Sequence, residues 1–213
     1  TTGGVGAGLT LTNIIFDDAG KKEGTVFAQA VSDGSVGAAS NDNLVYVQDA
    51  IIASNATVTT TITLGDGAVL RNFGGMSAVR ATGEAKLVME PGSVIEDASS
   101  ITRSKGDAGS VGPAGAVWLQ GSDFEMENGA EIKNVNGRAV YADGGSVSVG
   151  GTISGIIGNP AMWQGKDGTA IHLRGSAKAT LNGKISDCTE GVLVFVDKAV
   201  FEMATGSFLG NSD

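Results

Sequence analysis

A six-residue phrase, Ala-Val or Ala-Ile followed by three variable residues and Gly, recurs along the second half of the chain. Clear copies begin at Ala78, Ala116, Ala139 and Ala170, and a degenerate fifth copy begins at Val192. The intervals from 116 to 139 and from 170 to 192 span 22 or 23 residues, and the other two are longer. A unit of about 22 residues with two insertions explains all of them, so the sequence predicts a repeat protein.

Within each unit, apolar and polar residues alternate in three short runs. In the unit that begins at Ala116, the apolar positions are Val117 and Leu119, Phe124 and Met126, then Ile132 and Val135. A period of two, with Gly or Asn between the runs, is typical of three short strands joined by turns. In the fifth unit the same pattern points Leu193, Phe195, Phe201, Met203 and Phe208 inward.

The turn after the third run carries a small or amide residue in equivalent places. These residues are Asn72, Asp97, Asn134, Gly155, Asp187 and Gly210. Asn and Asp tolerate a left-handed φ and can bond to backbone nearby, so we expect a stacked corner. Cys188 follows Asp187 at the place that Val135 and Ile156 hold elsewhere. We therefore predict a buried thiol rather than an intermolecular disulfide.

This periodicity with its Asn/Asp corner resembles the right-handed parallel β-helix of the pectate-lyase-like superfamily. It is closest in character to adhesin-like or structural surface proteins of bacteria and archaea. The resemblance covers residues 44–213 and implies an all-β, single-domain solenoid of about 22 residues per coil. Two loop insertions are expected, from Ser99 to Gly115 and from about Ile156 to Thr169. Residues 1–43 are expected to form an irregular N-terminal segment with a first partial coil.

The variable letters of the repeated phrase define an outward face. If Val117 and Leu119 point into the core, Trp118 and Gln120 point out, and stacking places equivalent residues about 4.8 Å apart. Two outward columns follow: Arg80, Trp118, Tyr141, His172 and Val194, and beside them Thr82, Gln120, Asp143, Arg174 and Val196. Both insertions would flank this face, and Trp163 lies in the second.

This face is the candidate ligand-binding site. Its predicted residues are Arg80, Trp118, Gln120, Tyr141, Asp143, Trp163, His172 and Arg174. Aromatic planes could stack on sugar rings while the polar side chains bond hydroxyls. Two alternatives stay open at this point: the long loops pack onto the aromatic side chains, or the face is a protein interface.

Catalytic chemistry has weaker support in the sequence. Glycoside hydrolysis needs two carboxylates, and Asp143 is the only acid in the columns. Its partner would have to come from Asp107, Asp123 or Asp167. The Gly-His-Gly and Arg-Ile-Lys segments of polygalacturonases have no counterpart, and no second His accompanies His172 to bind a metal. The sequence favours a non-catalytic protein without metal or cofactor over an enzyme.

Charge and the last repeat bear on partners. The net charge of −9 repels phosphate backbones and anionic membranes, so we expect no nucleic-acid partner. No apolar stretch reaches the roughly 18–20 residues of a membrane span, so no membrane insertion is expected. Phe201, Met203 and Phe208 keep the last repeat apolar, without a polar cap. We therefore expect self-association, end to end or lateral, or neighbouring coils in a longer protein.

Taken together, these features predict an extracellular or cell-surface protein. The favoured hypothesis is a non-catalytic structural or adhesive β-helix, a subunit or module of a surface layer, sheath, fibre or adhesin. The alternative is a polysaccharide-binding or polysaccharide-degrading β-helix, a glycoside hydrolase or lyase, that uses the outward face of the first strand.

Overall fold

The computed structural model describes residues 8–17, 51–54, 60–73, 77–98, 115–157, 168–189 and 191–211. Within these ranges the chain forms strands β1 to β20 and no helix. The strands make three parallel sheets of seven, seven and six strands, which we call sheets A, B and C. The prediction of an all-β chain with parallel strands is confirmed.

Each sheet takes every third strand. Sheet A contains β1 (Gly8–Leu11), β4 (Thr60–Leu64), β7 (Ala85–Met89), β10 (Asp123–Met126), β13 (Ser146–Val149), β16 (Lys178–Leu181) and β19 (Val200–Met203). Sheet B contains β2 (Ile15–Asp17), β5 (Val69–Arg71), β8 (Val94–Glu96), β11 (Glu131–Asn136), β14 (Thr152–Ile157), β17 (Lys184–Thr189) and β20 (Phe208–Leu209). Sheet C contains β3 (Ile51–Ser54), β6 (Val79–Thr82), β9 (Val117–Gln120), β12 (Arg138–Asp143), β15 (Thr169–Arg174) and β18 (Val192–Asp197).

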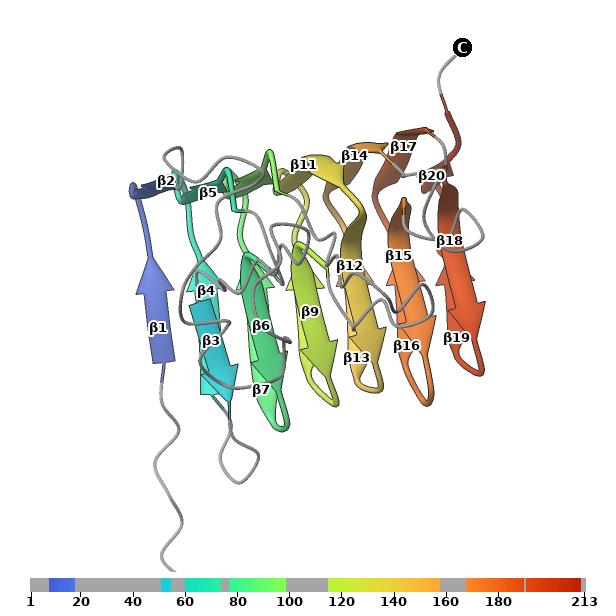
Figure 1. The fold of residues 1–213 in the computed structure, drawn as a ribbon, viewed down its shortest axis with the longest axis horizontal. Helices are drawn as coiled ribbons and strands as arrows, with labels where there is room; N and C mark the ends of the chain where they lie inside the picture. The colour runs from blue at the N-terminus through green and yellow to red at the C-terminus, as the bar shows by residue number, and fades with distance from the viewer. Residues whose placement is uncertain are drawn as a thin grey trace, which may run out of the picture.

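The chain therefore visits sheets C, A and B in turn, and we call one such round a coil. Figure 1 shows the coils following one another along the long axis, from the blue first strands to the red last ones. Parallel strands cannot be joined by tight hairpins, so each must be reached by a crossover. Here the strands of the other two sheets supply that crossover, an arrangement compatible with a parallel β-helix.

The register aligns the first four copies of the repeated phrase as predicted. Val117 pairs with Val79 and with Val140, and Val140 pairs with Ile171. The predicted inward positions of these coils lie in one hydrophobic core. Along sheet C the inward column alternates small and large residues, because Leu119 lies between Ala81 and Ala142. All three side chains are fully buried.

In the last coil, β18 and β20 differ from the prediction by one residue, whereas Phe201 and Met203 on β19 continue inward columns as predicted. Phe195 pairs with His172 and Val194 with Ile171, so Phe195 points outward and Val194 inward. Leu209, not Phe208, continues the inward column of Ile185. The stretch from Val192 to Val196 is apolar throughout, so its alternation carries no phase from which the faces could be read.

The predicted corner is confirmed for five of its six residues. Asn72, Asp97, Asn134, Gly155 and Asp187 all have a positive φ, between 53° and 63°. Gly210 does not share this conformation among the described residues. Its N–H bonds to the Ile185 carbonyl instead, and the next residue, Asn211, exchanges two 2.9 Å bonds with the backbone of Cys188.

The predicted domain boundary and the two predicted insertions fall largely outside the described residues. The boundary between residues 43 and 44 and most of both insertions, residues 99–114 and 158–167, lie outside them. Ile156 and Ile157, assigned to the second insertion, belong to β14. β1 pairs with β4 and β2 pairs with β5, within the residues assigned to the partial N-terminal coil. The described part of the chain contains no helix long and apolar enough to cross a bilayer.

Cys188 lies inside the core, as predicted, with Ile156 as its register partner. Burial raises the pKa of its thiol to about 11. We expect a bulky thiol reagent to label Cys188 slowly in the native protein at neutral pH, because the thiolate is the reactive species. The free energy of unfolding should fall as the pH rises from about 9 towards 11, because the unfolded thiol ionises first.

A Cys188→Ala variant is the control for the pH profile, since it should lack the part of this alkaline loss that the thiol causes. Labelling in denaturant gives the rate for the accessible thiol. Native labelling as fast as this reference would contradict the inward position of Cys188.

Candidate functional site

The outer face of sheet C carries two columns of register partners. The aromatic column consists of Arg80, Trp118, Tyr141, His172 and Phe195. The polar column consists of Thr82, Gln120, Asp143, Arg174 and Asp197. The structure thus brings together seven of the eight predicted site residues, and the eighth, Trp163, lies outside the described residues. Phe195 and Asp197 replace Val194 and Val196 of the predicted columns because of the shifted register of β18.

Neighbours in the aromatic column contact one another. The guanidinium carbon of Arg80 lies 5.1 Å from the Trp118 ring centroid, a cation–π geometry. The ring centroids of Tyr141 and His172 are 5.0 Å apart, and those of His172 and Phe195 are 4.7 Å apart in an edge-to-face arrangement. Such pairs each contribute about 0.5–1.5 kcal/mol beyond the area that they bury.

Three members of the aromatic column are buried although they point away from the core. Trp118 is 9% exposed, Tyr141 3% and His172 6%. Sugar stacking needs an accessible ring face, and these three rings do not offer one in this conformation. The alternative that the long loops pack onto these side chains stays a prediction, since most of both loops lies outside the described residues. The two exposed residues of the face, Gln120 and Arg174, both belong to the polar column.

Arg138, at the start of β12, is a member of this cluster that sequence reasoning missed. It is 7% exposed, and its guanidinium carbon lies 5.6 Å from the Tyr141 ring. A buried guanidinium needs compensating partners, and the ring face supplies one. Arg138 stands before the repeated phrase, at a turn position where a surface cation is ordinary. Nothing in the sequence distinguished Arg138 from an ordinary surface cation.

Arg174 links the two columns. Its guanidinium donates a 3.4 Å hydrogen bond to the Tyr141 hydroxyl, and its Nε lies 3.6 Å from Asp197 Oδ2. The bond to Tyr141, with the charges of Asp143 and Asp197, raises the pKa of Arg174. The Arg174 side chain is 51% exposed, so its pair with Asp197 is worth at most about 1 kcal/mol. It is a fixed cation that bulk solvent reaches.

The predicted carboxylate partners of Asp143 are described only in part. Asp107 and Asp167 lie outside the described residues, and Asp123 stands on sheet A, where it accepts a 2.9 Å bond from the Ser146 N–H. The described part of the chain also holds no cluster of three or more His, Cys, Asp or Glu residues suited to a metal.

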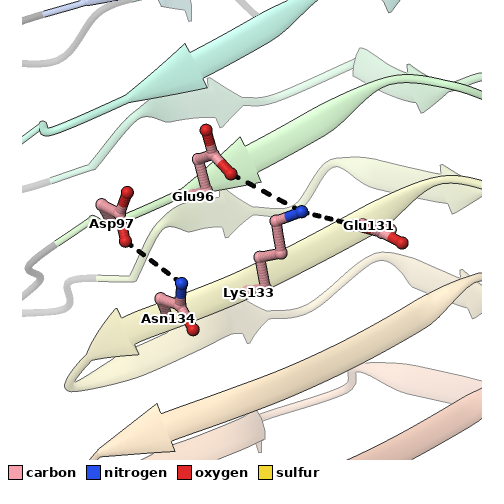
Figure 2. Close-up of polar contacts among 5 residues, drawn as sticks. All are labelled: Glu96, Asp97, Glu131, Lys133 and Asn134. Carbon is pink, nitrogen blue, oxygen red and sulfur yellow. Dashed lines mark hydrogen bonds and ion pairs between the residues drawn. The ribbon is translucent and has the colours of Figure 1, made fainter.

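A second polar cluster lies on sheet B, where it joins β8 to β11 (Figure 2). Lys133 Nζ lies 2.8 Å from Glu131 and 3.6 Å from Glu96 of the preceding coil. The hydrogen bond to Glu131, with the charges of both carboxylates, raises the pKa of Lys133. Beside it, the Asn134 amide donates a 3.2 Å bond to Asp97 in the corner. This cluster holds neighbouring coils in register.

Similar contacts join other coils. Lys86 on β7 and Glu125 on β10 form a 2.6 Å ion pair across sheet A. Arg71 and Asn72 both bond Asp17, which ties the first coil to the second. Each contact is partly exposed and individually weak. All of these contacts join a residue to the coil directly above or below it.

A shallow pocket of about 380 Å³ lies at the turns between sheets A and B in the last coils. Its residues include Asn128, Asn182, Lys184 and Phe208, and four glycines contribute bare backbone. Lys184 Nζ lies 5.5 Å from the Phe208 ring. Sequence reasoning did not predict this pocket, since it placed Phe208 in the core.

No protein-family model matches the chain, and comparisons with curated proteins and with solved structures gave no match.

Proposed function

We propose that the chain is a right-handed parallel β-helix that serves as a non-catalytic structural or adhesive module at the cell surface. One observation carries the proposal: the exposed apolar side chains concentrate at the first and last coils. In the coils between, the side chains at equivalent inward positions are buried. A stack with such ends is suited to extension by further coils.

The coil-to-coil contacts support the same role. Lys133 with Glu96, Lys86 with Glu125 and Arg71 with Asp17 all join neighbouring coils. Groups engaged in this way resist sliding of one coil over the next, which a load-bearing element requires. The acidic surface, with a net charge of −9, agrees with an extracellular setting.

The test is the solution state of the purified protein. Sedimentation velocity over a wide range of concentrations, with electron microscopy of the same samples, should show multimers that grow with concentration. Because like charges repel, added salt should favour assembly. A strict monomer at the highest concentration and salt would contradict the proposed function.

Polysaccharide binding is the second candidate, and the polar column favours it. Gln120 and Arg174 are exposed, Asp143 is partly exposed beside them, and Tyr141 and Asp197 hold the Arg174 guanidinium in place. Such groups suit the hydroxyls or carboxylates of a glycan. A glycan array with Arg174→Ala as the control tests this role. Absent binding, or binding that the variant leaves unchanged, would remove this candidate.

A further inference from the structure

We propose that copies of this chain stack head to tail, so that the last coil of one copy packs against the first coil of the next. The last coil consists of β18, β19 and β20, and the first coil of β1 and β2. This inference rests on the proposed function, since it names the partner as a second copy and places the interface at the two ends of the stack.

The inward columns run unbroken from one end to the other. On sheet A, one column begins at Leu11, which pairs with Leu64, and ends at Met203, which pairs with Leu181. On sheet B, a column begins at Phe16, which pairs with Leu70, and ends at Leu209, which pairs with Ile185. If the next copy continues this register, its Leu11 follows Met203 and its Phe16 follows Leu209.

The residues at the ends of these columns are more exposed than the residues within them. Phe16 is 39% exposed and Met203 is 47% exposed, whereas Leu64, Leu181 and Leu70 are fully buried. The difference arises because an inner residue has a stacked neighbour on both sides, and an end residue has one on a single side. A second copy placed in register would give each end residue its missing neighbour.

The large exposed apolar side chains of the described residues are concentrated at the ends. Leu9, Ile14, Ile15 and Phe16 belong to the first coil, Val192, Val196, Val200, Met203 and Phe208 belong to the last, and Ile157 is the one member between them. Leu9, Phe16, Val196 and Met203 of this set continue inward columns, whereas Ile15, Val200 and Phe208 lie on outer faces at the same two ends. The distribution favours end-to-end contact over lateral contact.

Strand direction decides which ends meet. All pairings in sheets A and B are parallel, and β1 and β19 are the opposite edges of sheet A, as β2 and β20 are of sheet B (Figure 1). A shift along the stack axis brings β19 beside the next copy's β1 with the same direction and register. Two like ends would have to meet with one copy inverted, which reverses the strands. The interface is therefore heterologous and does not close, so it builds filaments.

The test uses two variants that each block one end. Leu9→Lys places a charge at the first coil, on the inward column that runs from Leu9 to Phe201. Met203→Lys places a charge at the last coil, on the neighbouring inward column that runs from Leu11 to Met203. Both substitutions reduce the net negative charge, so increased repulsion between copies cannot explain a loss of assembly. Thr180→Lys is the matched control, because it adds the same charge on the outer face of β16, the next-to-last strand of sheet A, and leaves both end coils unchanged. Circular dichroism and thermal unfolding establish that each variant is folded.

Each blocked variant alone should stay monomeric, with the concentration for half-assembly raised about tenfold or more. The control should assemble like the unmodified chain. An equimolar mixture of the two blocked variants should form a one-to-one dimer that grows no further, because each partner brings one intact end. Sedimentation velocity or native mass spectrometry measures these species.

The other outcomes are distinguishable. Assembly of both blocked variants like the unmodified chain would overturn the head-to-tail interface in favour of lateral contact. Dimers of one blocked variant alone would show that like ends meet, and a mixture that stays monomeric would also overturn the inference. In these cases the unmodified chain still assembles and the proposed function stands. If the unmodified chain is itself monomeric, the proposed function fails as well.

Discussion

Replacing Leu119 by Ala should lower the free energy of unfolding by about 3–5 kcal/mol, near the upper end for such a truncation. Leu119 is fully buried, and its register partners on both sides, Ala81 and Ala142, are too small to fill the space that it would leave. A cavity that cannot collapse adds its own cost to the lost burial. Urea unfolding of dilute protein, followed by circular dichroism, measures the change.

Leu209→Ala is the matched control, because it makes the same truncation on an inward column at the last coil. Leu209 is only partly buried and has one stacked neighbour, Ile185. Leu209→Ala should lower the free energy of unfolding by about 1 kcal/mol. Equal losses at the two sites would contradict a core enclosed in the middle coils and open at the last one.

Replacing Gly183 by Ala should cost about 3 kcal/mol or more. Gly183 lies in the turn between β16 and β17, and a Cβ there would overlap the backbone oxygens of Gly150 and Gly151 in the preceding coil. These atoms cannot move aside as a side chain could, and the Lys184 N–H already bonds the Gly151 oxygen at 2.9 Å. The added methyl group must therefore separate two coils. Thermal unfolding gives the change in stability.

Gly206→Ala separates this steric effect from backbone strain. Gly206 has a φ of +86°, and a Cβ there would meet nothing within 4 Å. The variant should cost only the roughly 1–2 kcal/mol of a left-handed non-glycine residue. If Gly206→Ala proved the more damaging change, the close contact of coils at Gly183 would be wrong.

The sequence was sufficient for the strands and their register in four of the five repeat copies. In each of these copies the last outward position before the Gly is polar, so the phase of the alternation is defined; these residues are Thr82, Gln120, Asp143 and Arg174. The same logic failed for Phe195, because Val192 to Val196 offers no polar residue to mark the outer face. Because of this one-residue shift, the last member of each outward column was predicted wrongly.

The sequence predicted which face of the sheet a side chain lies on, but it did not predict whether that side chain is buried. Alternation placed Trp118, Tyr141 and His172 on the outer face, and the register places them there. Their burial depends on what packs over the sheet, which strand periodicity does not encode. Arg138 was missed for the same reason, since its burial and the Tyr141 ring near its guanidinium distinguish it from an ordinary turn cation, and strand periodicity encodes neither.

The polar contacts give the assembly proposal its physical basis. Inside the stack, the ion pairs and corner amides satisfy groups between coils, and the exposed apolar side chains are left mainly to the two ends. Addition of a coil at either end repeats contacts that the chain already makes. The same interactions that fold one copy would therefore hold the next.

The central claim is that the coils stack in register along one axis, and a spin-label distance tests it most directly. Thr63 on β4 and Glu202 on β19 belong to one outward column of sheet A, whose members between them are Val88, Glu125, Ser148 and Thr180. Five steps of about 4.8 Å predict a separation of about 24 Å between Thr63 and Glu202.

Nitroxides at these two positions, in a Cys188→Ala background and diluted with unlabelled protein, should give one narrow distance near this value. A second pair at Thr63 and Thr180 should be about 5 Å closer. Equal distances for the two pairs, or a broad distribution centred far from about 24 Å, would contradict the stacked register.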